Sequence, residues 1–187
     1  MDLVKPAHRH LPAYCAALKT GWSPNTLRRE AAGEQLAAIA RDPDAFLASL
    51  DDPQARGGDV ELPDGSFAAR LPSIRLWIWE NGFCGSIGLR WQPGTNALPP
   101  TASGHIGYAI VPWRRRAGLA TAAVRAMLLK AREVGLTAVD VTTDPDNTAS
   151  MRVIEKAGGV LISRHPRAPA LGVGEELLFR IPLDVSP

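Results

Sequence analysis

Hydrophobic and polar residues alternate through the middle of the chain, as they do in strands that bury one face. One such run starts at Ser73, and a second covers Phe83–Trp91. Between them lies Asn81-Gly82, a pair that two-residue hairpin turns prefer. A stretch rich in proline and glycine then leads to a third run, His105–Val111. The pattern therefore predicts three strands, of which the first two form a hairpin.

After Pro112 the hydrophobic period lengthens from two residues to about 3.6, which is the period of an α-helix. Apolar residues such as Leu119 and Leu129 recur along one side, and Gly135 is a typical stop beyond a helix. We therefore expect an amphipathic helix that ends near Gly135. Beyond it, the pattern predicts a strand, a second helix and two more strands, at Ala138–Thr143, Ala149–Ala157, Val160–Arg164 and Glu176–Ile181.

The first part of the chain has helical periodicity instead. Helices are expected at Leu11–Leu18, Leu27–Ala40 and Asp44–Leu50. The polar stretch Asp51–Pro72 carries turn signals and has room for a short hairpin. This order of elements predicts an α/β (mixed α+β) fold, with a central mixed, twisted sheet of about six to seven strands and helices on both faces. We expect residues 1–187 to form one domain.

Composition narrows the class of protein. The 187 residues are 45% hydrophobic and 21% charged with a net charge of +2, which is too weakly basic for a typical nucleic-acid binder. No apolar run approaches the roughly 20 residues of a membrane span, and Met1–His10 lacks the apolar core of a secretion signal. Cys15 and Cys84 have no metal-ligand spacing. We expect a cytoplasmic protein with no metal and with neither nucleic acid nor membrane as a partner.

The loop Arg115–Thr121 joins the third predicted strand directly to the long predicted helix. The first turn of a helix has backbone N–H groups without intrahelical partners, and the helix dipole adds positive potential there. Gly118 and Ala120 are small enough for an anion to approach the backbone, and Thr121 adds a hydroxyl group. The run Arg114-Arg115-Arg116 supplies positive charge. The loop is therefore a candidate phosphate-binding site.

This segment resembles the acyl-CoA pyrophosphate loop of the GNAT superfamily, whose pattern is Arg/Gln-x-x-Gly-x-Gly/Ala between a strand and a helix. A second signature of that family, Asn-x-x-Ser/Ala opening a helix that closes in Glu-Lys-x-Gly, is matched by Asn147 to Ser150 and by Glu155 to Gly158. The resemblance covers Ser73–Leu183. The Ile-Gly-Tyr strand before the loop looks most like the branch that contains ribosomal-protein N-terminal acetyltransferases.

The resemblance implies an enzyme that transfers an acetyl group from acetyl-CoA to a primary amine of a small molecule or a protein N-terminus. The pantetheine arm would lie between His105–Val111 and Ala138–Thr143, two strands that splay apart in the family. Homodimers are a further expectation from the resemblance. The residues expected to hold the coenzyme are Ile110, Val111, Arg115, Arg116, Ala117, Gly118, Leu119, Ala120, Thr121 and Asn147.

Amine acylation needs a base, because a free alkyl ammonium with a pKa of about 10 is mostly protonated at neutral pH. His105 is the first candidate, since histidine has an ordinary pKa of about 6.5 and the residue starts the strand before the loop. The alternative is that His105 only lines a strand end. Glu80 is the second candidate, and Glu175 and Glu176 are the third. A chain of water molecules is also open as a route.

The acid that protonates the coenzyme thiolate is open as well. Many members of the family use a tyrosine of the second helix, and Ile154 takes that position here. Ser150 is a candidate hydrogen-bond donor to the sulfur. Tyr108 is a further candidate for the acid, although its alternation with Ile106 and Ile110 is more typical of a packed core tyrosine. The missing tyrosine leaves a competing hypothesis, a non-catalytic acyl-CoA-binding or regulatory protein.

Overall fold

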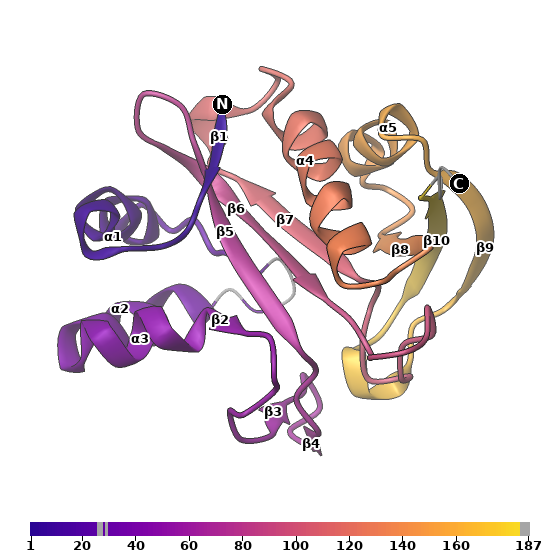
Figure 1. Ribbon diagram of the computed structural model, residues 1–187, viewed down its shortest axis with the longest axis horizontal. Helices are drawn as coiled ribbons and strands as arrows, with labels where there is room; N and C mark the ends of the chain where they lie inside the picture. Colours follow the sequence, from indigo (N-terminus) through magenta and orange to yellow (C-terminus); the bar gives the residue numbers. More distant parts are fainter. Residues whose placement is uncertain (26–27, 29, 184–187) are drawn as a thin grey trace.

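The computed structural model describes residues 1–25, 28 and 30–183 (Figure 1). Its helices are α1 (Leu11–Lys19), α2 (Ala31–Arg41), α3 (Pro43–Ser49), α4 (Leu119–Glu133) and α5 (Thr148–Lys156), with 3-10 turns at His8–His10, Pro112–Arg114 and Pro169–Leu171. Its strands are β1 (Asp2–Val4), β2 (Asp51–Asp52), β3 (Val60–Glu61), β4 (Phe67–Ala68), β5 (Ser73–Trp79), β6 (Phe83–Arg90), β7 (Ile106–Ile110), β8 (Ala138–Thr143), β9 (Val160–Pro166) and β10 (Glu175–Pro182).

The strands form two main sheets. The larger has the order β1-β5-β6-β7 with β2 also on β5, and the smaller has the order β8-β10-β9. Strands β3 and β4 make a separate short hairpin within the polar stretch, as expected. The division falls between β7 and β8, the strands expected to splay apart, which form no ladder with each other. The mixed α/β fold predicted from the sequence is confirmed, with its central sheet split at this point.

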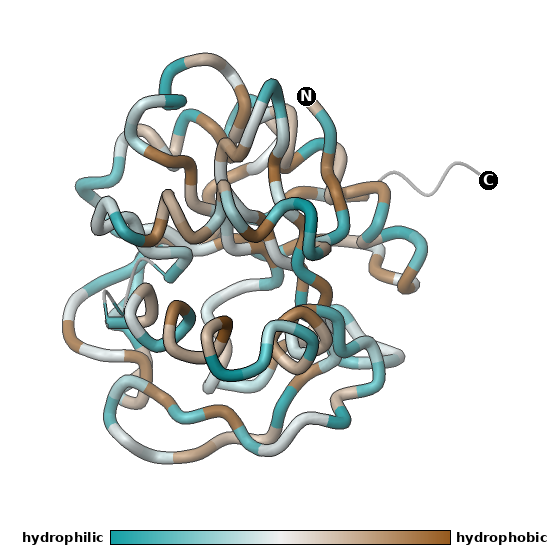
Figure 2. Tube along the Cα trace, turned by 90° about the vertical axis from the view of Figure 1, so that its left-hand side faces the viewer, coloured by the Kyte–Doolittle hydropathy of each residue, from teal (hydrophilic) through white to brown (hydrophobic). Residues whose placement is uncertain are grey.

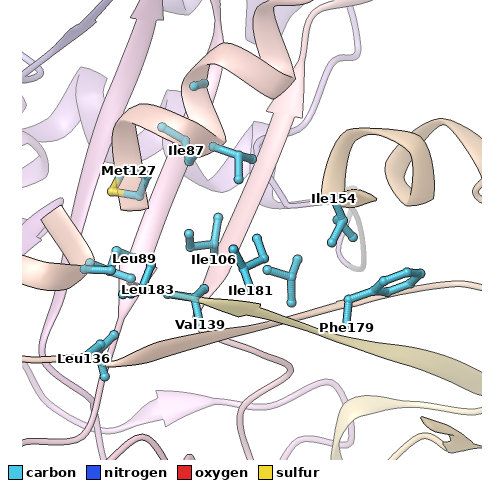
Figure 3. Packing of buried hydrophobic residues seen from close by; sticks show 14 of the residues in the cluster. Ile87, Leu89, Ile106, Met127, Leu136, Val139, Ile154, Phe179, Ile181 and Leu183 are labelled. Atoms are coloured by element: carbon cyan, nitrogen blue, oxygen red, sulfur yellow. The ribbon is translucent and has the colours of Figure 1, made fainter. Parts of the chain in front are cut away.

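Helices cover both faces of the larger sheet (Figure 1). On one face α4 and α5 bury a cluster with both sheets, in which Met127 and Ile154 pack with Ile87, Val139 and Phe179 (Figure 3). On the other face α1, α2 and α3 bury a second cluster around the stacked rings of Tyr14 and Trp77, whose centroids lie 4.3 Å apart. Val111, just before the loop that precedes α4, belongs to the second cluster, and Leu119, just after it, belongs to the first.

The hydropathy pattern explains which face of strand β8 is buried. Hydrophobic and hydrophilic positions follow one another closely along the chain in Figure 2. In β8 exposure alternates strictly, with Val139 and Val141 buried and Asp140 and Thr142 partly exposed. This alternation is the reason that the predicted bounds of β8 agree with the structure to the residue.

Local signals fix most element ends. Asn81 and Gly82 have φ angles of 51° and 123°, the positive values that a tight hairpin turn requires. The side chain of Asp42 caps α3 by accepting a hydrogen bond of 2.9 Å from the Ala45 N–H. Leu27, the predicted start of the second helix, lies outside the described residues, and α2 is described from Ala31. The three-residue strand β1 was not predicted, because it is too short to show a period.

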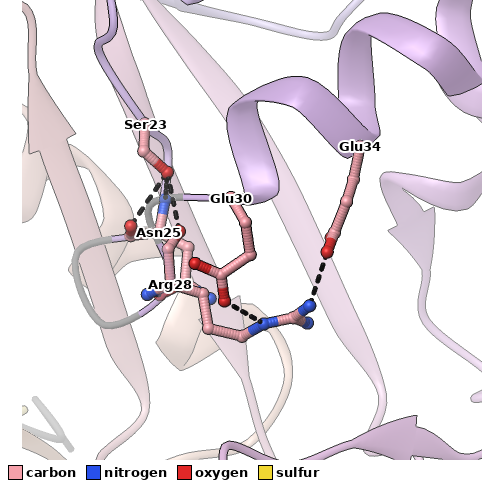
Figure 4. A network of polar contacts seen from close by, with 5 residues as sticks. All are labelled: Ser23, Asn25, Arg28, Glu30 and Glu34. Carbon is pink, nitrogen blue, oxygen red and sulfur yellow. Dashed lines mark hydrogen bonds and ion pairs between the residues drawn. The ribbon is translucent and has the colours of Figure 1, made fainter.

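A charged contact lies just ahead of α2 (Figure 4). Arg28 donates from Nε to Glu30 at 3.1 Å and from Nη2 to Glu34 at 2.6 Å. Its backbone N–H donates to the Asn25 side chain at 3.2 Å. Because Glu30 and Glu34 are exposed, solvent screens both ion pairs, and each adds little to stability.

Nowhere in residues 1–25, 28 and 30–183 is there a helix long and apolar enough to cross a membrane.

Candidate functional site

Strands β7 and β8 are joined at one end only. The His105 N–H donates to the Asp140 carbonyl at 2.6 Å, and the Asp140 N–H donates to His105 Nδ1 at 2.9 Å. Gly104 makes this junction possible, since a Cβ at its φ of +74° would lie 2.9 Å from the Asp140 oxygen. Beyond the junction the facing edges of the two strands are not paired with each other.

The backbone of Ile110 faces this unpaired edge. The neighbouring Val111 N–H donates to the Cys84 carbonyl of β6 at 3.0 Å, and antiparallel strands alternate the sides to which successive residues direct their N–H groups. The Ile110 N–H therefore points away from β6, toward β8. Of the two residues predicted to meet the coenzyme at this strand end, Ile110 has an N–H group without an acceptor in the described part of the chain, and Val111 does not.

The loop after β7 carries a run of free backbone donors. Within the part of the chain that the structure describes, none of the N–H groups of residues 116 to 121 donates a hydrogen bond. Helix α4 starts at Leu119, and its first bond runs from the Ala122 N–H to the Gly118 carbonyl at 3.1 Å. Gly118 has a φ of +75° and Arg116 one of +64°, so the chain curls and its N–H groups converge. The loop therefore stays the candidate anion site that the sequence predicts.

The three arginines of the loop have different partners. Arg114 donates to the Glu80 carbonyl and so ties the loop to the β5–β6 hairpin. Arg115 Nε donates to the Ile110 carbonyl at 3.2 Å, back along β7. Arg116 is exposed, and its side chain contacts no acceptor among the described residues. Arg116 is thus the guanidinium most available to an incoming phosphate.

The start of α5 faces β7 through two hydroxyl groups. Asn147 caps the helix by accepting from the Ser150 N–H at 3.1 Å. The Ser150 hydroxyl lies 2.9 Å from the Tyr108 hydroxyl. Burial raises the pKa of Tyr108, with the Ser150 contact opposing the shift, so the phenol keeps its proton at neutral pH. The sequence offered both residues as candidate donors, but it favoured a packed core role for Tyr108 and did not predict that the two hydroxyl groups meet.

Ile154, at the position where many family members have a tyrosine, belongs to the core. Its side chain is fully buried in the cluster under α4 and α5. A Cβ at Gly159 would lie 2.4 Å from Ile154 Cγ2, so this glycine leaves the room that the isoleucine fills. Ile154 therefore takes no part in proton transfer, and Tyr108 brings a phenol to α5 from the strand side instead.

His105 is completely buried at the junction of β7 and β8. Burial lowers its pKa, opposed by the Asp140 charge and hydrogen bond, so the ring is neutral. Since Nδ1 accepts from the Asp140 N–H, the ring proton is on Nε2, and Nε2 has no partner among the described residues. In this tautomer the ring presents a donor. The assignment of His105 as general base stays a prediction, and the geometry disfavours it.

The candidate acids lie in different places. Glu80 is 41% exposed and pairs with the N-terminal ammonium at 3.4 Å, on the β1–β5 side of the sheet. Glu175 is exposed and pairs with Arg164. Glu176 is buried, with a side chain 7% exposed, and its carboxylate lies 3.7 Å from Arg167 Nε. The structure thus does not bring Glu80 to Ser150, whereas Glu176 stands near the end of β8 that leads into α5.

Arg167 links Glu176 to that end of β8. It contacts the carboxylate of Asp144, the first residue after β8, and also that of Glu176 on β10. Asp144 is three residues before Asn147, the cap of α5, and the Asn147 N–H donates to the Asp144 carbonyl at 3.1 Å. A buried carboxylate therefore lies one loop away from the Tyr108–Ser150 pair.

Fold and loop together define the class of an acyl-CoA-dependent acetyltransferase. The chain belongs to the family described as acetyltransferase (GNAT) domain, whose model matches residues 3–160. The resemblance stated from the motifs is therefore confirmed. A search of curated proteins finds no significant match.

Several solved structures share the fold. RimJ from Mycobacterium smegmatis, in complex with CoA-disulfide, is 20% identical with a TM-score of 0.64, over 96% of this chain and 80% of that one. The microcin C7 self-immunity acetyltransferase MccE, in complex with acetyl-CoA and AMP, is 12% identical with a TM-score of 0.60, over 96% and 91%. A putative ribosomal-protein-serine acetyltransferase from Vibrio cholerae is 14% identical with a TM-score of 0.58, over 96% and 92%.

Proposed function

We propose that this protein transfers the acetyl group of acetyl-CoA to a primary amine. The observation that carries the proposal is the run of six free N–H groups at residues 116 to 121, which opens α4 beside the unpaired edge of β7. Backbone donors and a helix N-terminus together favour a pyrophosphate. Arg116 adds an exposed positive charge at the rim, and Thr121 adds a hydroxyl group.

The pantetheine arm would then extend along the edge of β7 that faces β8. It is an amide-bearing chain, and this edge offers backbone groups that no ladder uses. The free N–H of Ile110 would donate to the thioester oxygen as negative charge develops on it. One oriented donor of this kind contributes about 3 kcal/mol to an acyl-transfer transition state.

The Tyr108–Ser150 pair supplies the acid. The amine nitrogen attacks the thioester carbon, the C–S bond breaks, and the sulfur leaves as a thiolate that needs one proton. Tyr108 holds a proton at neutral pH because burial raises its pKa. Ser150 lies 2.9 Å from it and relays the proton or holds the phenol in place. Tyr108 then regains its proton from solvent through Ser150, and the base passes the proton of the amine to solvent, which closes the balance.

We assign the removal of the amine proton to Glu176, directly or through one water molecule. Glu176 is the buried carboxylate near the end of β8 from which α5 starts. His105 suits this step less, because its Nδ1 lone pair is occupied by the Asp140 N–H and its Nε2 carries the proton. The acceptor is a small molecule or a protein N-terminus that presents a primary amine.

Calorimetric titration of acetyl-CoA into the protein and two variants tests the coenzyme site. No atom lies within 4 Å of a Cβ built at Gly118, so Gly118→Ala fits and only adds backbone strain at its φ of +75°. Gly118→Trp carries the same strain but fills the space in front of the N–H groups. We expect wild type and Gly118→Ala to bind, and Gly118→Trp to bind too weakly to detect.

Equal binding by Gly118→Trp, or no binding by the wild type, would contradict the proposal. Where binding is present, release of CoA thiol with a panel of primary amines separates the enzyme from its rival, a non-catalytic acyl-CoA-binding protein. Thiol release that depends on the amine excludes the rival. Tight binding without release for every amine would favour it.

A further inference from the structure

A second group of donors without acceptors lies on the sheet face that α1 covers in part. Arg75 of β5 stands opposite Gly88 of β6, which stands opposite Gly107 of β7. Two residues further along β6, Arg90 lies opposite His105, the residue before β7, because the Arg90 N–H donates to the His105 carbonyl at 2.9 Å. Residues that oppose each other in antiparallel strands share a face. Both arginines and the histidine therefore belong to one surface of the sheet.

The two glycines make room for the guanidinium groups. A Cβ at Gly88 would lie 3.4 Å from Arg75 Cζ and from Arg75 Nη2, and one at Gly107 would lie 3.8 Å from Arg90 Nη2. Each guanidinium therefore lies over a glycine, on two adjacent strands. Both arginines are only partly exposed. Burial lowers the pKa of each, and the charge of Arg75 lowers the pKa of Arg90 further.

No carboxylate neutralises these two arginines in residues 1–25, 28 and 30–183. Neither has an acidic side chain within the 4.0 Å of an ion pair. Asp140 of β8 is already held by Arg180 through two bonds of 2.7 and 2.8 Å. Tyr14 interacts with Arg75, but burial raises the pKa of Tyr14 so that it stays uncharged. Two like charges in a partly buried place favour an external anion.

Buried donors adjoin the two arginines on the same face. His105 is completely buried, and its Nε2–H has no acceptor in the described structure. Ser86 is also completely buried, and its hydroxyl is likewise without a partner there. Ser86 is two residues from Gly88 on β6, so its side chain points to the same face. The site offers donors and positive charge, which is the complement of an anionic group.

We propose that the amine acceptor carries a carboxylate or phosphate group, which Arg75 and Arg90 bind over Gly88 and Gly107 with the His105 Nε2–H as a third donor. This inference rests on the proposed function, because it places the reacting amine near Ile110. Gly107 is three residues before Ile110, or roughly 10 Å along an extended strand. The anionic group and the amine of the acceptor are therefore about 10 Å apart.

Matched acceptors test the preference for an anion. The first pair is 8-aminooctanoate and its carboxamide, and the second is the peptide amides Ser-Ala-Asp and Ser-Ala-Asn. The variants are Arg75→Gln and Arg90→Gln, with Arg132→Gln on the exposed side of α4 as a control for the loss of one positive charge. Circular dichroism confirms the fold of each variant, and kcat/KM is measured with saturating acetyl-CoA.

We expect the wild type and Arg132→Gln to prefer the anionic member of at least one pair by about tenfold or more in kcat/KM, mainly through KM. In Arg75→Gln and Arg90→Gln that ratio should fall toward one. A preference for the aminooctanoate alone indicates a small-molecule acceptor, and one for the peptide alone indicates a protein N-terminus. Turnover without any preference, or a preference that survives in both variants, overturns the inference and leaves the proposed function standing.

A binding measurement decides the matter if no acceptor is turned over. Inorganic phosphate is titrated into the protein saturated with CoA, which fills the loop before α4, and the unfolding temperature is followed. Stabilisation of the wild type and Arg132→Gln that is lost in Arg75→Gln and Arg90→Gln supports the anion site even where the proposed function has failed. Equal stabilisation of all four proteins, or none, overturns the anion site.

Discussion

Tyr108 and Ser150 are 42 residues apart in sequence, and their hydroxyl groups meet only because α5 folds back toward β7. Both are polar groups at the edge of an apolar cluster, and each satisfies the other. The pair gives the chain a phenol near the unpaired edge of β7, although the helix itself has isoleucine at the family's usual tyrosine position. The acid role of the pair can be tested separately from coenzyme binding.

Replacement of Tyr108 by phenylalanine should lower kcat by about 10²-fold. This factor is the lower end of the rate enhancement that a general acid typically contributes. The dissociation constant of acetyl-CoA should change little, because the phenol is not part of the loop at residues 116 to 121. Burial raises the pKa of Tyr108 above its ordinary value of about 10, so wild-type kcat should show no loss of the acid between about pH 8 and 9.5. A phenylalanine variant with wild-type kcat would exclude the role.

His105 should make stability depend on pH. Burial lowers its pKa in the folded state, whereas the unfolded chain has a histidine pKa of about 6.5. Below about pH 6.5 the unfolded state binds a proton that the folded state excludes, so the contribution present at higher pH is lost on acidification. Urea titrations at about pH 7.5 and about pH 5 measure the free energy of unfolding lost on acidification. This loss should be about 1 kcal/mol smaller in His105→Asn than in the wild type. Identical losses in the two proteins would show that the ring is protonated in the fold.

At the scale of elements, the junction of β7 and β8 depends on one close approach. Gly104→Ala adds a Cβ 2.9 Å from the Asp140 carbonyl, at a φ of +74°. Gly94→Ala has a similar φ of +77° but no atom within 4 Å of the new Cβ, so it measures backbone strain alone. We expect Gly94→Ala to cost about 1 kcal/mol of unfolding free energy and Gly104→Ala about 1–3 kcal/mol more. Equal costs would mean that the contact with β8 yields easily.

Period and turn chemistry are local, and they predicted the elements well. The strand Ala138–Thr143 and the Asn81-Gly82 turn needed only alternation and positive φ angles. The anion loop was also visible locally, since it needs only a strand, a glycine and a helix start. The contacts of the side chains in the site were harder to predict from the sequence. The tautomer of His105 is set by the Asp140 N–H, which is 35 residues away in sequence, so a pattern cannot reveal it.

The arginines over the glycines show the same limit. Arg75 and Arg90 read as ordinary outward-facing residues of alternating strands. Their proximity depends on register, which sets Gly88 between Arg75 and Gly107. Register follows from the turn and from burial together, and a one-residue slip would move each side chain to the other face.

At the scale of the whole molecule, two contacts hold the two sheets together. One is the backbone junction between His105 and Asp140, and the other is the packing of side chains in the cluster under α4 and α5. A coenzyme lying along β7 would contact both sides. At a hundred times its dissociation constant, acetyl-CoA should add about 2.7 kcal/mol of stability and raise the unfolding temperature by about 5–10 °C. Differential scanning fluorimetry measures the shift, and Gly118→Trp should show none. A shift of equal size in that variant would place the coenzyme elsewhere.

The packing of Ile154 against Gly159 has an evolutionary consequence. A tyrosine at residue 154 alone would put a larger side chain into the buried space beside Gly159 that isoleucine now fills. It would also bring a second phenol to a helix that Tyr108 already serves. We therefore expect a change to the helix-borne tyrosine to need compensating changes at residues 108 and 159. Among descendants of this sequence, residues 108, 154 and 159 should therefore change together, as an epistatic set.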